Sequence, residues 1–150
     1  MHRAVDFLKE RFPEDVLEVV EFRGETTLVV HPRAIRALLT ALRDAPEMSY
    51  KYLSMIAAVD YYPAEPRFGV VYNLYSHRYR DRLTLKCLLP GEAPVIDSVV
   101  SVHATADFHE REAYDLMGIV FRGHPNLKRI LLPPDFVGFP LRKEFPQRGQ

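Results

Sequence analysis

The chain of 150 residues has one cysteine, no glycine-rich loop and no long apolar run, and each shortage excludes a class of function. A single thiol, Cys87, cannot form an internal disulfide, a zinc finger or an iron–sulfur site, so we expect it to be a small buried side chain. The seven glycines are scattered and match neither a dinucleotide-binding loop nor a Walker loop. Apolar runs stay far below the roughly 18 residues of a membrane span. No charged-then-apolar leader opens the sequence, so we expect no secretory signal.

The chain also has no excess of charge of either sign, because 20 Lys and Arg balance 20 Asp and Glu. It therefore has no general attraction for nucleic acid or anionic lipid. The charge is uneven, however. Residues 118–150 contain six Lys or Arg against two Asp or Glu, a balance of +4, whereas residues 1–117 carry a balance of −4. We expect this basic end either to bind a partner or to fold back onto its own acidic body.

Hydrophobic periodicity predicts helices and strands that are interleaved without strict alternation. This arrangement indicates the α+β class, with two layers: a mixed or antiparallel sheet, helices on one face, and an extended Gly/Pro-rich C-terminal tail. We expect one domain with a core at residues 1–117 and a tail at residues 118–150. Helices are predicted at residues 2–12 and 32–43 and strands at 16–22, 26–31, within 50–62, 67–76, 82–89 and 119–121, while residues 95–102 suit a short helix or a strand.

A third, highly charged helix is predicted to end at Met117. Thr105 or Asp107 can cap its start, and Glu110 follows Asp107 at capping-box spacing. Gly118 is well placed to end it in the left-handed conformation.

The charges of this helix allow several interpretations. Phe108, Glu112 and Leu116 share one stripe, which predicts that Glu112 lies between apolar side chains and needs a polar partner. Arg111 and Asp115 are spaced to pair on the adjacent face. Glu112 could therefore hold the basic tail, act as an acid or base, or bind a metal, and we favour the structural role.

A metal site fits the spacing poorly. His109 and Glu110 begin the zincin pattern, but Ala113 stands where the second histidine is needed. A stand-alone metal-dependent enzyme using His103, His109 and Glu112 remains one alternative. A nucleic-acid module using the basic tail is another.

The tail combines proline, aromatic and basic residues. Pro133 and Pro134 stiffen it, which lowers the entropic cost of ordering it on a partner. Arg142 and Lys143 are expected in extended backbone, where they can pair with acidic groups.

The residues from Glu110 onward resemble the family of the thirty-kilodalton subunit of NADH-quinone oxidoreductase, respiratory complex I. The resemblance depends on Glu110-Arg111-Glu112, Tyr114-Asp115-Leu116, Gly118-Ile119, Phe121, Gly123-His124-Pro125, Leu127, Arg129-Ile130-Leu131, Asp135-Phe136, Gly138, Pro140-Leu141-Arg142-Lys143 and Phe145-Pro146.

This resemblance implies a non-redox structural subunit in the peripheral arm of a proton-pumping NADH:quinone oxidoreductase, with no catalytic, cofactor-binding or metal-binding residue of its own. FMN and the iron–sulfur clusters would belong to partner subunits. The implied partners are the quinone-site large subunit and iron–sulfur subunits, on the cytoplasmic face of the cell membrane, without nucleic acid and with membrane contact only through the complex. An equivalent subunit of a membrane-bound hydrogenase or a coenzyme F420 dehydrogenase is the related alternative. The residues expected to anchor the tail or meet partners are Glu110, Arg111, Glu112, Asp115, Gly118, Gly123, His124, Pro125, Arg129, Asp135, Arg142 and Lys143.

Overall fold

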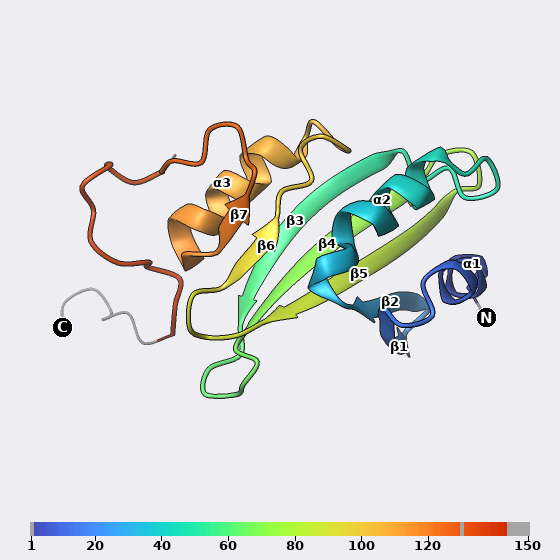
Figure 1. The fold of residues 1–150 in the computed structure, drawn as a ribbon, viewed down its shortest axis with the longest axis horizontal. Coiled ribbons are helices and arrows are strands. Elements are labelled where there is room, and N and C mark those ends of the chain that lie inside the picture. Colours follow the sequence, from blue (N-terminus) through green and yellow to red (C-terminus); the bar gives the residue numbers. More distant parts are fainter. Residues whose placement is uncertain (1, 130, 144–150) are drawn as a thin grey trace.

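A mixed sheet of five strands forms the centre of the molecule (Figure 1). The computed structural model describes residues 2–129 and 131–143. The strand order is β1-β2-β5-β4-β3, with β2 and β5 parallel and the other neighbours antiparallel. This confirms the α+β class and the mixed sheet. The strands are β1 (Val16–Phe22), β2 (Glu25–Val30), β3 (Tyr52–Asp60), β4 (Phe68–Ser76) and β5 (Asp81–Leu89).

The helices pack on one face of this sheet. Along β4, Val70 and Tyr72 are buried, whereas Asn73 between buried neighbours is partly exposed. Such alternation is typical of a sheet with one face toward the core and one toward solvent. Cys87 of β5 is buried as expected, and burial raises the pKa of its thiol to about 12. The helical elements are α1 (Arg3–Arg11), η1 (Pro32–Ala34), α2 (Ile35–Asp44) and α3 (Ala106–Met117), and no helix within the described residues is long and apolar enough to cross a bilayer.

A second sheet of two strands pairs the segment that precedes α3 with the segment that follows it. Strands β6 (Val95–Asp97) and β7 (Val120–Arg122) pair in parallel, so the start of the segment 95–102 is a strand. Ile119 and Phe121 are buried in the core. The predicted tail, residues 118–150, therefore includes β7, a strand that packs against the body. We use the name docked segment for residues 123–143, which follow β7.

Candidate partner-binding site

The docked segment begins where α3 ends, at a glycine that no other residue can replace without strain. Gly118 has φ +78°, and its N–H donates to the carbonyl of Tyr114 at 2.9 Å. Only glycine adopts this left-handed conformation without a steric cost. A Cβ here would also lie 2.6 Å from Nη2 of Arg142 and 2.7 Å from the Phe139 ring. The predicted helix stop is confirmed, and the same position lets the docked segment approach α3 closely.

Asp115 on α3 forms the first attachment of the docked segment. Its carboxylate accepts from Nη1 of Arg129 at 2.9 Å and from the backbone N–H groups of Leu131 and Leu132 at 2.7 and 3.1 Å. The Asp115 side chain is fully buried and that of Arg129 is 10% exposed. The same guanidinium donates to the carbonyls of Asp115 and Gly138. A carboxylate buried this deeply is tolerated only with such partners, so this attachment is a fixed one.

Arg142 forms the second attachment. Its Nε donates to the carbonyl of Met117 at 2.8 Å, and its guanidinium lies over the rings of Phe68 and Phe139 at 5.1 and 4.7 Å. The N–H of Leu141 donates to the carbonyl of Leu116 at 3.0 Å. These bonds satisfy carbonyl groups at the C-terminal end of α3 that have no partner within the helix.

Asp60, at the end of β3, forms the third attachment. Its carboxylate accepts from the backbone N–H of Lys143 at 2.8 Å. Arg67 donates to both carboxylate oxygens at 2.7 Å, and this pairing holds the pKa of Asp60 well below its ordinary range. The docked segment is thus attached to two elements of the body, α3 and β3.

The buried carboxylate near the N-terminal half of α3 is Glu110, and the prediction for Glu112 is wrong. Glu110 is fully buried and accepts from Oγ of Ser98 at 2.6 Å and from the N–H of Val99 at 2.8 Å. Burial raises its pKa, and these two hydrogen bonds oppose that rise. Glu112 is exposed, and so is Phe108.

The error has a simple cause. The core-facing stripe of α3 is Ala106, Glu110, Ala113 and Met117, at helical spacing. The two alanines gave this stripe less apparent hydrophobicity than the larger side chains on the outer face. The capping box is also wrong, because Glu110 binds the segment before α3 and Thr105 makes no side-chain cap.

The other candidate residues lie around this site in different ways. His124 has its Nε2 2.9 Å from Oδ1 of Asp107, and its Nδ1 accepts from the N–H of Asn126, so it links the turn at Gly123 to the start of α3. Arg111 lies over the Phe108 ring at 5.9 Å and makes no ion pair with Asp115 within the described ranges. Pro125, Asp135 and the side chain of Lys143 are exposed.

A metal site does not assemble in the part of the chain that the structure describes. No group of three or more His, Cys, Asp or Glu side chains is close enough to hold an ion there. His103 is buried, which lowers its pKa, and its Nε2 has no hydrogen-bond partner among those residues. The alternative that joined His103, His109 and Glu112 has no support from this geometry.

Three large apolar side chains of the docked segment are exposed, among charged ones such as Lys128 and Asp135. Leu131, Val137 and Leu141 are 60%, 88% and 55% exposed. They lie among residues whose backbone and arginines are attached to the body, so their positions are fixed while their side chains face outward. Sequence reasoning assigned Leu131 to a short apolar patch but did not single out Val137 or Leu141, because it placed the partner contact on the basic side chains.

Comparison with known proteins identifies the family. The model of the respiratory-chain NADH dehydrogenase 30 Kd subunit matches residues 28–150. The chain belongs to this family. Its relatives include the corresponding NADH-quinone oxidoreductase subunits of Geotalea uraniireducens, 48% identical over 99% of this chain and 89% of the relative, and of Geobacter sulfurreducens, 46% identical over 99% and 91%.

Solved structures agree with this family assignment. A trypsin-resistant fragment of Nqo5 is 30% identical, with a TM-score of 0.70 over 84% of this chain and all of the fragment. A chain of the archaeal membrane-bound sulfane sulfur reductase has a TM-score of 0.79 over 96% of this chain and 84% of its own, at 24% identity, and shows the fold alone. Members of the 30 kDa family are subunits of an oxidoreductase complex, so the contacts described above lie on a chain that works among other subunits.

Proposed function

We propose that this chain is a non-redox assembly subunit in the peripheral arm of a proton-pumping NADH:quinone oxidoreductase, and that its docked segment binds the neighbouring subunits. The observation that supports this most directly is the combination of three fixed attachments, at Asp115, Met117 and Asp60, with outward-facing apolar side chains. A segment that only closed its own core would turn these side chains inward.

The attachments explain how such a segment gains affinity. Ordering a flexible chain on a partner opposes binding, whereas a segment already ordered on its own body avoids most of that cost. Burying each large apolar side chain against a partner then contributes about 1.5–3 kcal/mol. The arginines Arg129 and Arg142 therefore act as positioning residues in this proposal, because their guanidinium groups lie on the body.

The chemistry of the complex is assigned to other subunits in this proposal. We place FMN and the iron–sulfur clusters in partner subunits and no catalytic residue in this chain. The buried thiol of Cys87 supports this, because it is the only cysteine available to ligate a cluster. The proposed partners are the quinone-site large subunit and the adjacent iron–sulfur subunits, at the cytoplasmic face of the membrane, with no nucleic acid involved.

Incorporation of variants into the complex tests the proposal. The double substitution Leu131→Asp and Val137→Asp changes two outward side chains and keeps the backbone N–H of Leu131 that donates to Asp115. It should lower the share of the chain found in assembled complex by about tenfold. Leu17→Asp with Phe22→Asp, which changes similarly exposed apolar residues of β1, is the matched control and should assemble normally. Normal assembly of the Leu131 and Val137 variant, with its fold intact by circular dichroism, would show that this surface binds no partner.

A further inference from the structure

The face of the sheet opposite the helices contains a second candidate surface. A hollow of about 780 Å³ lies on it, lined by residues of β2, β3, β4 and β5. Ser54, Asn73 and Thr84 supply polar groups to its lining, and Tyr52 and Tyr75 supply rings. The hydroxyl of Thr84 already donates to Oδ1 of Asn73. The hollow is therefore wide, open and able to offer hydrogen bonds.

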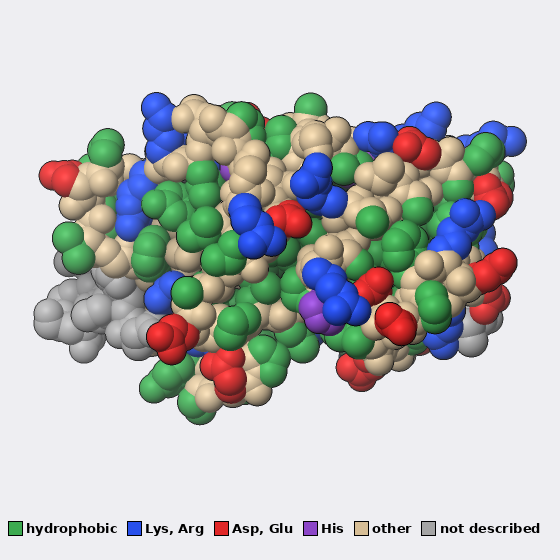
Figure 2. All heavy atoms as spheres, in the orientation of Figure 1, with side chains coloured by type: hydrophobic (Ala, Val, Ile, Leu, Met, Phe, Trp, Pro, Cys, Tyr) green, Lys and Arg blue, Asp and Glu red, His purple; other side chains and the backbone are tan. Residues whose placement is uncertain are grey.

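Positive charge gathers at one end of this hollow. Arg80 and Arg82 line it and are exposed, and Arg78 lies in the same turn between β4 and β5. None of the three guanidinium groups has a carboxylate partner within residues 2–129 and 131–143. Figure 1 places the β4–β5 turn at the right end of the sheet, and Figure 2, which shows the opposite face that carries the helices, has Lys and Arg mixed with Asp and Glu at that end.

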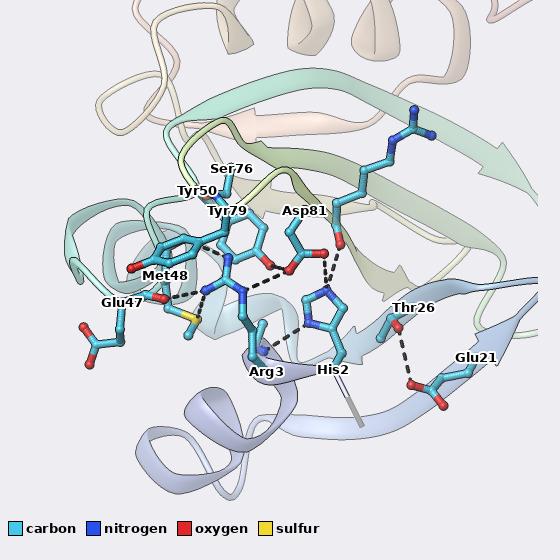
Figure 3. A network of polar contacts seen from close by, with 12 residues as sticks. His2, Arg3, Glu21, Thr26, Glu47, Met48, Tyr50, Ser76, Tyr79 and Asp81 are labelled. Carbon is cyan, nitrogen blue, oxygen red and sulfur yellow. Dashed lines mark hydrogen bonds and ion pairs between the residues drawn. The ribbon is translucent and has the colours of Figure 1, made fainter.

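Two carboxylates also line the hollow, Glu25 of β2 and Asp81 of β5, and neither makes an ion pair with Arg80 or Arg82 in the part of the chain that the structure describes. Asp81 stands between Arg80 and Arg82 in the chain, but its oxygens face the N-terminal helix (Figure 3). Nε of Arg3 lies 3.1 Å from Oδ2, Nε2 of His2 lies 3.1 Å from Oδ1, and the hydroxyl of Tyr50 donates to Oδ2 at 2.7 Å. The charge of Asp81 is thus already compensated by Arg3.

The turn that carries the arginines is held in place. The hydroxyl of Tyr79 donates to the carbonyl of Pro46 at 3.1 Å, and the Arg3 guanidinium lies 4.3 Å from the centre of the Tyr79 ring. Arg80 has φ +51°, a conformation that non-glycine residues adopt rarely and that needs support from surrounding contacts. Because the backbone of this turn is already held in place, only the arginine side chains need to be ordered when they bind an anion.

We propose that this open face binds an extended acidic segment of another polypeptide, whose carboxylates pair with Arg80 and Arg82 while its backbone lies over the polar lining. Charge complementarity selects an acidic occupant. A polypeptide is favoured over a nucleic acid because the chain as a whole carries no net positive charge that would attract a long polyanion. Membership in a family of complex subunits supplies a protein environment.

This surface is distinct from the docked segment. Strand β4 begins at Phe68, beneath Arg142, and ends at Ser76, next to the arginine turn. Eight residue steps at about 3.3 Å separate these points by about 26 Å. The chain would therefore hold two partner segments at opposite ends of the same sheet, and each can be tested without the other.

Titration of the full chain with a deca-glutamate peptide tests the proposal, with deca-glutamine as the neutral peptide. Replacing Arg80 and Arg82 with Gln should weaken deca-glutamate binding about fivefold, the effect expected for two exposed ion pairs. The matched control replaces Lys9 and Arg36, two exposed cations elsewhere on the body, with Gln and should leave binding unchanged. Binding of deca-glutamate to the wild-type chain should disappear near 1 M salt, where the screening length is about 3 Å. This measurement tests the proposal without any variant.

Three outcomes would overturn the proposal. The first is no difference between the two double variants, or no binding of deca-glutamate at all. The second is tighter binding of a ten-nucleotide oligothymidylate than of deca-glutamate, which would indicate a nucleic-acid surface. The third is a photo-crosslinker at Tyr52 that, in the assembled complex, captures no segment or one not rich in Asp and Glu.

Discussion

Replacing Asp115 with Ala should release the docked segment from α3 while the sheet stays folded. The substitution removes the acceptor of Arg129 and of the N–H groups of Leu131 and Leu132. Arg129, which is 10% exposed, would then be a buried cation without its carboxylate. The segment can relieve this by detaching, because detachment returns the guanidinium to water.

The size of the effect follows from the burial of the pair. Breaking a buried ion pair by removing one partner typically costs about 3–5 kcal/mol. Taking about 3 kcal/mol, the ratio of docked to released chains falls by a factor of about 160. The sheet does not depend on this pair, since β4 and β5 pair with each other over nine residues.

Hydrogen exchange measures this directly. The amides of Leu131 and Leu132 should exchange much faster in the Asp115→Ala variant, while the amides of β4 keep their protection. Asp135→Asn, which changes an exposed carboxylate of the same segment, is the control and should leave all these rates unchanged. Unaltered exchange at Leu131 and Leu132, or an equal loss of protection throughout β4, would refute the reasoning.

Three further changes test neighbouring parts of the site. Glu110→Ala should lower the free energy of unfolding in urea by about 2 kcal/mol, because it leaves the hydroxyl of Ser98 and the N–H of Val99 unpaired. Glu112→Ala should change it by less than about 0.5 kcal/mol. The reverse order would restore Glu112 as the buried carboxylate. Gly118→Ala should cost at least about 1–2 kcal/mol for its left-handed backbone and should also speed exchange at Leu141, and a neutral melting temperature would contradict it. The fold lowers the pKa of Asp60, so the stabilisation from its carboxylate is complete above the ordinary carboxyl pKa of 3.8 and declines as the pH falls below that value. The difference in unfolding free energy between the wild type and Asp60→Asn should therefore shrink on acidification. A difference that stayed constant would exclude a lowered pKa for Asp60.

The sequence predicted the regular elements wherever one pattern dominated. Alternating residues identified β4 and β5, Pro32 marked the start of a helical segment, and Gly118 marked the end of another. Sequence reasoning failed on the buried face of α3, because the alanines there are small and made the face look less hydrophobic than the outer one. It could not reveal that Asp60 binds the N–H of Lys143, because a contact between residues so distant in the chain depends on the assembled sheet.

The parallel pairing of β2 with β5 also has a consequence for synthesis on the ribosome. Strands β3, β4 and β5 are consecutive and can pair as soon as they emerge, but β2 must wait for Thr84–Lys86, more than fifty residues after Thr27–Val29. At about 5–20 residues per second, the nascent hairpin of β1 and β2 stays without its neighbour for several seconds. We expect chaperone contact during translation to concentrate on that hairpin, whose outer strand exposes Leu17 and Phe22.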